Sequence, residues 1–161
     1  MILVTIGTNE QPFDRLIRAA ARLEGDESLL VQYGSSREPH GRGEWVDFIP
    51  FDELSDRVRE ARVVICHAGV GSIMLARRCG KRPIVVPRRL HLGEAVDDHQ
   101  LAIARRLHAN GIVTLVEEVE LLPEVIRTAD DRAVSALGDD EQGARLLTGD
   151  LRKYLEGLVA A

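Results

Sequence analysis

The sequence lacks any apolar run that could cross a membrane, and it contains only two cysteines. A membrane-spanning helix needs ~18 or more largely apolar residues in a row, and no segment approaches that length. Cys66 and Cys79 have no second pair of cysteines with which to build a disulfide framework or a metal centre. We therefore predict reduced cysteines that serve packing, no metal site and no membrane-spanning segment.

A secretion signal is also missing from the start of the sequence. Residues 1–7 (MILVTIG) have neither the basic leader nor the small-residue cleavage site of a signal peptide, and they are typical of an opening strand. The sequence therefore predicts a cytoplasmic protein.

Positive charge is in the minority. Lys and Arg number 21 against 26 Asp and Glu, which gives a formal net charge of −5. A general nucleic-acid binder needs a basic face, so that class is disfavoured. Residues 77–89 are the exception, because they carry six Lys and Arg and no acid. They form either a solvated helix face or a surface for anionic lipid or a diphosphate, and the pattern does not decide between these.

The 161 residues have the length of one domain. Short β-branched runs alternate with amphipathic stretches, which indicates a parallel sheet covered by helices. Strands are expected at residues 2–6, 29–33, 45–49, 63–66, 84–86 and 112–116, and helices at 12–23, 51–61, 71–79 and 94–109. From about residue 121 two terminal helices are expected, at 121–137 and 141–159. We predict an α/β fold, with one Rossmann-like parallel-sheet domain over residues 1–161.

The glycine-rich segment CHAGVGS is the strongest candidate binding site. It leaves the apolar strand at 63–66 and opens a helix, and ligands of parallel sheets bind beyond the carboxyl ends of the strands. Gly69 and Gly71 allow close approach of a phosphate, the helix N-terminus offers N–H groups, and Ser72 adds a hydroxyl. The alternative is a tight turn whose glycines serve helix packing. The segment lacks the third glycine of the dinucleotide fingerprint, and no Gly-Lys-Ser/Thr phosphate loop is present, so NAD and ATP are disfavoured.

Two further polar segments follow expected strands. Gly7 and Thr8 come after the first strand, which is weak evidence alone. The cluster DDHQ ends in His99 and Gln100, whose imidazole and amide groups suit sugar hydroxyls. Its acids are favoured at a helix start whatever the function. His67 is open between a core histidine, a phosphate donor and an acid/base group.

Five segments, in consistent order within residues 1–116, resemble the C-terminal donor domain of glycosyltransferase family 28. They are GTNEQPFDRL, WVDFIPFDEL, ICHAGVGSI, the strand end VVPR and the cluster DDHQ. The pattern resembles in particular the short subunits of two-subunit UDP-sugar transferases of N-glycan and bacterial exopolysaccharide assembly. Five ordered motifs are more specific than one glycine loop. The resemblance implies the C-terminal half of a GT-B fold.

The same resemblance implies roles for individual residues. Those expected at the donor diphosphate are Gly7, Thr8, Gly69, Gly71 and Ser72. Those expected at the uracil, largely through backbone groups, are Phe48 and Ile49. Those expected at the donor sugar are Glu94, Asp98, His99 and Gln100. The acid that grips the ribose in the related peptidoglycan transferase matches Leu75 here, which leaves that contact unassigned, with Glu94 as a weak substitute. The catalytic residue is also unassigned, with His67 and His99 as candidates.

The implied activity is an inverting transfer of a hexosyl unit, such as N-acetylglucosamine, from a UDP-sugar to a membrane-anchored, lipid-linked acceptor. The UDP-sugar is the substrate, and no cofactor is expected. Every motif belongs to the donor side, so a separate membrane-anchored subunit is expected to bind the acceptor and supply the base. That subunit would hold the chain at the inner face of the membrane. The alternatives are a non-catalytic UDP-sugar-binding regulatory module and an epimerase-like enzyme, which would ordinarily need a second domain.

An apolar stripe in the second terminal helix is a candidate interface. Its members are Leu147, Leu151, Tyr154, Leu155 and Leu158. Most such stripes pack on the parent domain. In the resembling two-subunit enzymes the C-terminal region helps to join the halves. The stripe would therefore meet the partner subunit or, without it, a second copy of the chain in a homodimer.

Overall fold

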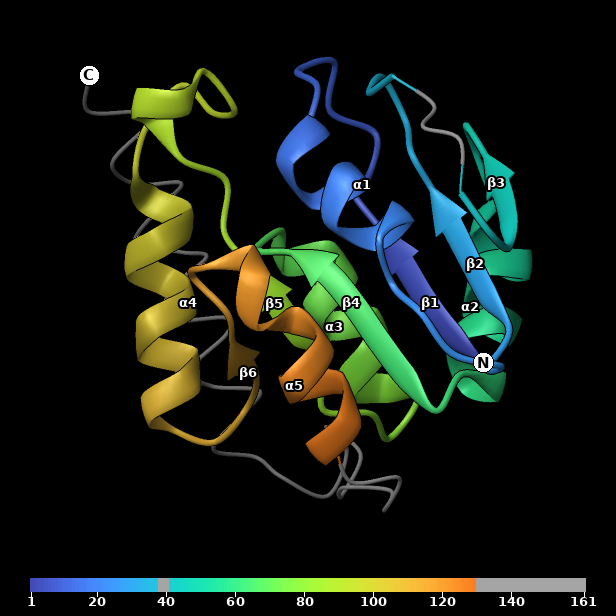
Figure 1. The fold of residues 1–161 in the computed structure, drawn as a ribbon. Coiled ribbons are helices and arrows are strands. Elements are labelled where there is room, and N and C mark those ends of the chain that lie inside the picture. The colour runs from blue at the N-terminus through green and yellow to red at the C-terminus, as the bar shows by residue number, and fades with distance from the viewer. Residues whose placement is uncertain (38–40, 130–161) are drawn as a thin grey trace.

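The computed structural model describes residues 1–37 and 41–129, which build a parallel sheet with helices on both faces (Figure 1). The six strands are β1 (Ile2–Thr5), β2 (Leu29–Gln32), β3 (Glu44–Val46), β4 (Val63–His67), β5 (Ile84–Val86) and β6 (Thr114–Leu115). The α-helices are α1 (Asp14–Ala21), α2 (Phe51–Glu60), α3 (Val70–Arg78), α4 (His99–Ala109) and α5 (Leu122–Thr128), and the 3-10 turns are η1 (Leu90–Leu92) and η2 (Val119–Leu121). The predicted α/β, Rossmann-like fold is confirmed.

The central strands are buried on both faces, which explains why they are continuous apolar runs. All four residues of β1 are buried, and so are those of β2. Strands of a parallel sheet covered on both sides have this composition rather than an alternating one. On one face α1 and α5 pack against the sheet, and on the other face lie α2, α3 and α4 (Figure 1).

The order of the strands fixes where a ligand can bind. The order is β3-β2-β1-β4-β5-β6. The chain adds β2 and β3 on one side of β1, returns to place β4 on the other side of β1, and then adds β5 and β6 beyond β4. Loops that follow neighbouring parallel strands diverge at such a reversal and leave a crevice. Thr5 pairs with Cys66 at the carboxyl ends of β1 and β4, so the segments after these two strands begin side by side.

The cysteines are free thiols, as predicted. Cys66 is buried between the sheet and the helices α3 and α4, and burial raises the pKa of its thiol to about 12. Cys79 packs against the cluster formed by β1, α2 and α3. Within residues 1–37 and 41–129, no helix is long and apolar enough to cross a membrane.

Several expected element boundaries are wrong. The helix expected from residue 94 begins at His99, because Gly93 adopts a left-handed conformation (φ 70°) and the following residues form a loop. The helix expected over 121–137 ends at Thr128, where Ala129 is extended. The other expected terminal helix, its apolar stripe and most of the region after α5 lie outside the described residues. A single domain over residues 1–161 therefore stays a prediction.

Candidate functional site

Two adjoining cavities open at the carboxyl end of the sheet, around the reversal between β1 and β4. The α3 cavity, of about 550 Å³, is lined by Thr5, Gly7, Thr8, Asn9, Gln32, Phe48, Ile49, Phe51, Leu54, His67, Gly69, Gly71, Ser72 and Leu75. The α4 cavity, of about 700 Å³, is lined by Thr8, Asn9, Glu10, Gln11, Ala68, Gly69, Val70, Ala95, Val96, Asp97, His99, Gln100 and Ile103. Thr8, Asn9 and Gly69 line both, so one extended ligand can occupy the two together.

The N-terminus of α3 supplies backbone donors to the α3 cavity. Gly69 is the N-cap residue, and no side chain in the described part of the chain caps the helix. The N–H of Ile73 donates to the Gly69 carbonyl at 3.1 Å, so the three N–H groups before it have no partner within the helix. Gly71 and Ser72 belong to that first turn and line the cavity. Such a helix end favours an anion through its N–H groups and its dipole.

The three glycines of the site differ in what a side chain at each position would meet. Gly7 has a left-handed φ of 73°, and a Cβ there would lie 2.6 Å from His67 Cε1. A Cβ on Gly69 would lie 2.1 Å from His67 Nε2. A Cβ on Gly71 would meet no atom within 4 Å, and the residue is exposed. Gly7 and Gly69 therefore make room for the His67 ring, whereas nothing in the described protein requires a glycine at position 71.

His67 is held as a neutral imidazole between these glycines. Burial and, to a smaller extent, the charge of Arg88 lower its pKa to about 4, against a small opposite effect of the Thr5 carbonyl. Its Nδ1 is buried and has no hydrogen-bond partner in residues 1–37 and 41–129. At neutral pH the uncharged His67 ring can donate a hydrogen bond to a ligand or accept one from it, but it is a weak base. Both of its predicted roles stay predictions.

Two buried polar side chains, which the sequence analysis missed, shape the turn at Gly7. The Thr5 hydroxyl donates to Gln32 Oε1. The Gly7 N–H donates to Thr5 Oγ1 at 3.4 Å, and Gln32 Nε2 donates to the Gly7 carbonyl at 3.5 Å. The sequence indicates both residues, because Thr5 and Gln32 are each the one polar residue at the end of an otherwise apolar strand.

The residues predicted at the uracil, Phe48 and Ile49, line the α3 cavity together with Phe51. Phe48 is 59% exposed and Phe51 is 67% exposed, so their rings offer apolar surface to a ligand. Ile49 is buried. Leu75 also lines this cavity and offers it an apolar side chain, so the ribose contact stays unassigned. The uracil role stays a prediction.

His99 and Gln100 line the α4 cavity, together with Asp97. The Asp97 carboxylate accepts a hydrogen bond from the His99 N–H at 3.0 Å and lies 3.1 Å from His99 Nδ1. Gln100 Oε1 accepts from the N–H of Arg88 at 3.3 Å. Because its oxygen is engaged by the backbone, the amide nitrogen of Gln100 is the group left to bind a hydroxyl oxygen.

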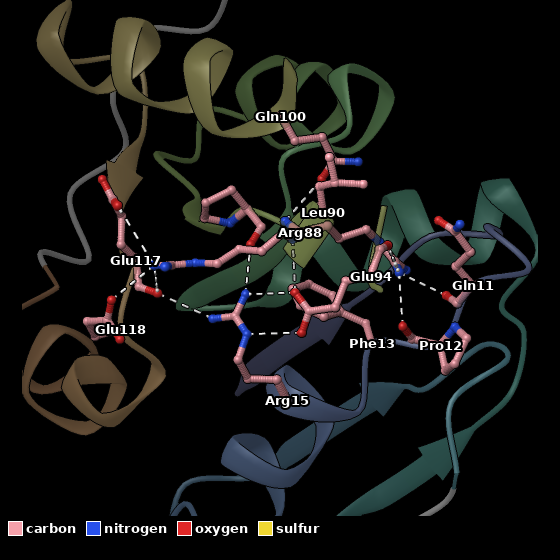
Figure 2. Close-up of polar contacts among 12 residues, drawn as sticks. Gln11, Pro12, Phe13, Arg15, Arg88, Leu90, Glu94, Gln100, Glu117 and Glu118 are labelled. Carbon is pink, nitrogen blue, oxygen red and sulfur yellow. Dashed lines mark hydrogen bonds and ion pairs between the residues drawn. The ribbon is translucent and has the colours of Figure 1, made fainter. Parts of the chain in front are cut away.

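The other two residues predicted at the sugar do not line either cavity. Glu94 is 6% exposed, and its carboxylate accepts two hydrogen bonds of 3.0 Å from Arg15 and one of 3.1 Å from the N–H of Arg89 (Figure 2). Asp98 accepts from the N–H of Leu90 at 3.2 Å. Both acids therefore stabilise, through these hydrogen bonds, the loop that forms one wall of the α4 cavity. A direct contact of either acid with the sugar stays a prediction.

The basic stretch at 77–89 is not one surface. Arg77 is 4% exposed and Arg88 is fully buried, whereas Arg78 and Arg82 are exposed. The expectation of a single solvated or lipid-facing patch is therefore wrong for the two buried arginines. Among the residues that the structure describes, no cluster of three or more His, Cys, Asp or Glu could hold a metal ion.

The chain matches the family model described as the glycosyltransferase family 28 C-terminal domain over residues 1–142. It is 32% identical over 122 residues to the UDP-N-acetylglucosamine transferase subunit ALG13 of Yarrowia lipolytica, which covers 66% of this chain and 60% of that protein. It is 34% identical over 113 residues to the UDP-N-acetylglucosamine--N-acetylmuramyl-(pentapeptide) pyrophosphoryl-undecaprenol N-acetylglucosamine transferase of Geobacter metallireducens, covering 65% of this chain and 30% of that protein. The chain thus spans less than two thirds of the length of either relative.

Solved glycosyltransferases share the fold. MurG of Acinetobacter baumannii superposes with a TM-score of 0.57 at 21% identity, covering 91% of this chain and 44% of that protein. The calicheamicin glycosyltransferase CalG4 superposes with a TM-score of 0.55 at 20% identity, covering 94% and 38%. Less than half of each GT-B enzyme is matched, as expected for one half of that fold. The chain belongs to glycosyltransferase family 28, and its residues 1–142 match the C-terminal domain of that family.

Proposed function

We propose that this chain is the donor-binding subunit of an inverting glycosyltransferase, which moves a hexosyl unit from a UDP-sugar to a membrane-anchored, lipid-linked acceptor. The observation that carries the proposal is the pair of adjoining cavities, one with an uncapped helix N-terminus and the other with His99 and Gln100. Together they offer an apolar surface for a base, donors for a diphosphate and polar groups for a sugar.

The donor is placed across the two cavities. Uracil packs against Phe48 and Ile49, and the diphosphate accepts hydrogen bonds from the N–H groups at Gly71 and Ser72. The sugar then lies past Gly69, next to His99 and Gln100. The N-terminus of α3 stabilises the negative charge that develops on the departing diphosphate. The acceptor hydroxyl attacks the opposite face of the anomeric carbon, which gives inversion.

The base for the acceptor hydroxyl is assigned to a partner subunit. His67, with a pKa of about 4, is too weak a base for efficient proton abstraction at neutral pH. The similarity to a protein named as a transferase subunit supports a partner, and the similarity to a transferase that acts on pyrophosphoryl-undecaprenol supports a lipid-linked acceptor. A partner anchored in the membrane would place this chain at its cytoplasmic face.

The test has two stages. Calorimetric titration of the full chain with UDP, ADP and UDP-sugars comes first, and tighter binding of UDP than of ADP is expected. The chain is then co-expressed with candidate membrane-anchored subunits, and transfer of labelled sugar to membrane lipid is measured. Transfer is expected only with a partner. Equal affinity for UDP and ADP would contradict the donor assignment, and robust transfer by the purified chain alone would contradict the need for a partner. UDP-sugar binding without transfer with any partner would favour the regulatory module.

A further inference from the structure

Arg88 is a buried cation in contact with Gln11 and Gln100, two residues that line the α4 cavity. It follows β5 and is fully buried, yet it lines neither cavity. Its guanidinium donates to four backbone carbonyls at 2.8–3.3 Å, those of Ile6, Gln11, Pro12 and Glu94. The bonds to Gln11 and Pro12 can be followed in Figure 2. It also lies over the Phe13 ring, 4.7 Å from the ring centre.

Within residues 1–37 and 41–129, no carboxylate contacts Arg88 and neutralises its charge. The nearby acid, Glu94, gives Arg88 only its backbone carbonyl, because its carboxylate pairs with Arg15 (Figure 2). Burial lowers the pKa of Arg88, and the charge of Glu94 raises it, but a guanidinium stays protonated in proteins. Carbonyl dipoles and an aromatic face solvate the cation without cancelling its charge. A buried net charge of this kind is costly unless an anion is bound nearby.

The field of Arg88 reaches the α3 cavity. The charge lowers the pKa of His67, whose ring lies against Gly69 in the wall of that cavity. Both side chains are largely buried, so water screens the interaction between them only weakly. A field that disfavours a positive charge on His67 favours a negative charge on a ligand at the same place.

Arg88 also ties the two walls of the α4 cavity together. On one side its guanidinium holds the carbonyls of Gln11 and Pro12, and Gln11 lines the cavity. On the other side it holds the Glu94 carbonyl, and its backbone N–H holds the side chain of Gln100. The cation is therefore kept in place by the same loops that surround the ligand.

We propose that Arg88 strengthens binding of the donor diphosphate through its charge, as a buried positioning residue that does not touch the ligand. This rests on the proposed function, since a UDP-sugar supplies the anion. Arg88 is thus the internal counter-charge for a ligand that the N-terminus of α3 binds directly.

The test compares a charged ligand with an uncharged one. Arg88→Gln removes the charge but keeps an amide that can donate to carbonyls, and Arg88→Lys keeps the charge. The matched control is Arg77→Gln, which changes another buried arginine at the opposite end of α3. Affinities for UDP and for uridine are measured by calorimetry on the full chain. Circular dichroism and thermal denaturation show which variants are folded, and Arg88→Met serves as the neutral variant if Arg88→Gln does not fold.

Arg88→Gln is expected to weaken UDP binding about ten-fold, as a unit charge within about 10 Å does at an effective dielectric constant of about 20. Uridine affinity should not change, and Arg88→Lys and Arg77→Gln should remain close to the parent protein. In a ligand-free NMR titration, the neutral variant should raise the pKa of His67.

Three results would overturn the proposal. These are unchanged UDP binding in the folded neutral variant, an equal loss for UDP and uridine, and an unchanged pKa of His67. Failure of the parent protein to bind UDP would instead contradict the proposed function, and the His67 titration would still report whether the Arg88 charge reaches the cavity.

Discussion

Replacing Gly71 with alanine should stabilise the protein and weaken its binding of UDP. An ideal Cβ at Gly71 meets no atom within 4 Å, and its φ is not in the left-handed region. The residue lies in the first turn of α3. Alanine in a helix is more stable than glycine by about 0.5–1 kcal/mol. For a chain of 161 residues this corresponds to a rise in Tm of about 1–4 °C.

The same methyl group should oppose the ligand. Gly71 lines the α3 cavity at the helix end where the diphosphate is expected, so the methyl group is added beside the ligand. Loss of one hydrogen bond to a charged group costs about 1.5–3 kcal/mol. Since 1.4 kcal/mol is a factor of ten, Gly71→Ala should bind UDP about 10- to 100-fold more weakly. A bulkier valine should abolish measurable binding.

The assay combines thermal denaturation without ligand and calorimetric titration with UDP. Gly69→Ala is the matched control on the same loop, because its Cβ would collide with His67 and should lower Tm. Gly71→Ala is thus expected to separate stability from binding, and Gly69→Ala to impair both. Normal UDP affinity in Gly71→Ala would place the phosphate site elsewhere. A lower Tm in that variant would show that the glycine is needed for folding.

Three further predictions concern the α4 wall and His67. Gln100→Ala should weaken binding of UDP-sugar more than binding of UDP, because Gln100 lines the α4 cavity and not the α3 cavity. Acidification from pH 6.5 to about 4 should reduce the unfolding free energy by about 3 kcal/mol through His67, since the folded state, with a pKa of about 4, binds fewer protons there than the unfolded chain. Arg15→Met should destabilise the protein by about 3 kcal/mol, because it leaves the buried Glu94 carboxylate without its cation.

Each of these three has its own check. Calorimetry with both ligands tests Gln100→Ala, and equal losses would move this residue into the nucleotide site or a structural role. Chemical denaturation at several pH values tests the His67 prediction by measuring the unfolding free energy as a function of pH. His67→Gln should remove the part of the pH dependence that His67 causes. The same dependence in both proteins would assign the loss of stability to other groups. For Arg15, adding Glu94→Gln to Arg15→Met should restore part of the lost stability. If the double variant loses as much stability as the two single variants together, the result would argue against coupling between Arg15 and Glu94.

The sequence alone determined the sheet and the position of the site. Apolar runs such as ILVT and LLVQ are buried on both faces, so their strand character does not depend on distant contacts. Gly69, Gly71 and Ser72 follow such a run directly, and the carboxyl ends of parallel strands meet at one edge. Local composition and topology were therefore sufficient to predict these residues at a cavity, and their contact with a ligand stays a prediction.

Only the tertiary structure decided the roles of Arg88, Glu94 and the individual glycines. Sequence places Arg88 in a basic stretch, but burial turns it into an internal cation held by carbonyls up to 82 positions away. Glu94 belongs to a polar segment typical of a ligand site, yet Arg15, 79 positions before it, takes its carboxylate. Gly69 and Gly71 are the same residue type two positions apart, and the His67 ring lies against Gly69 but not against Gly71. These contacts depend on packing between residues far apart in the sequence, so no local sequence pattern predicts them.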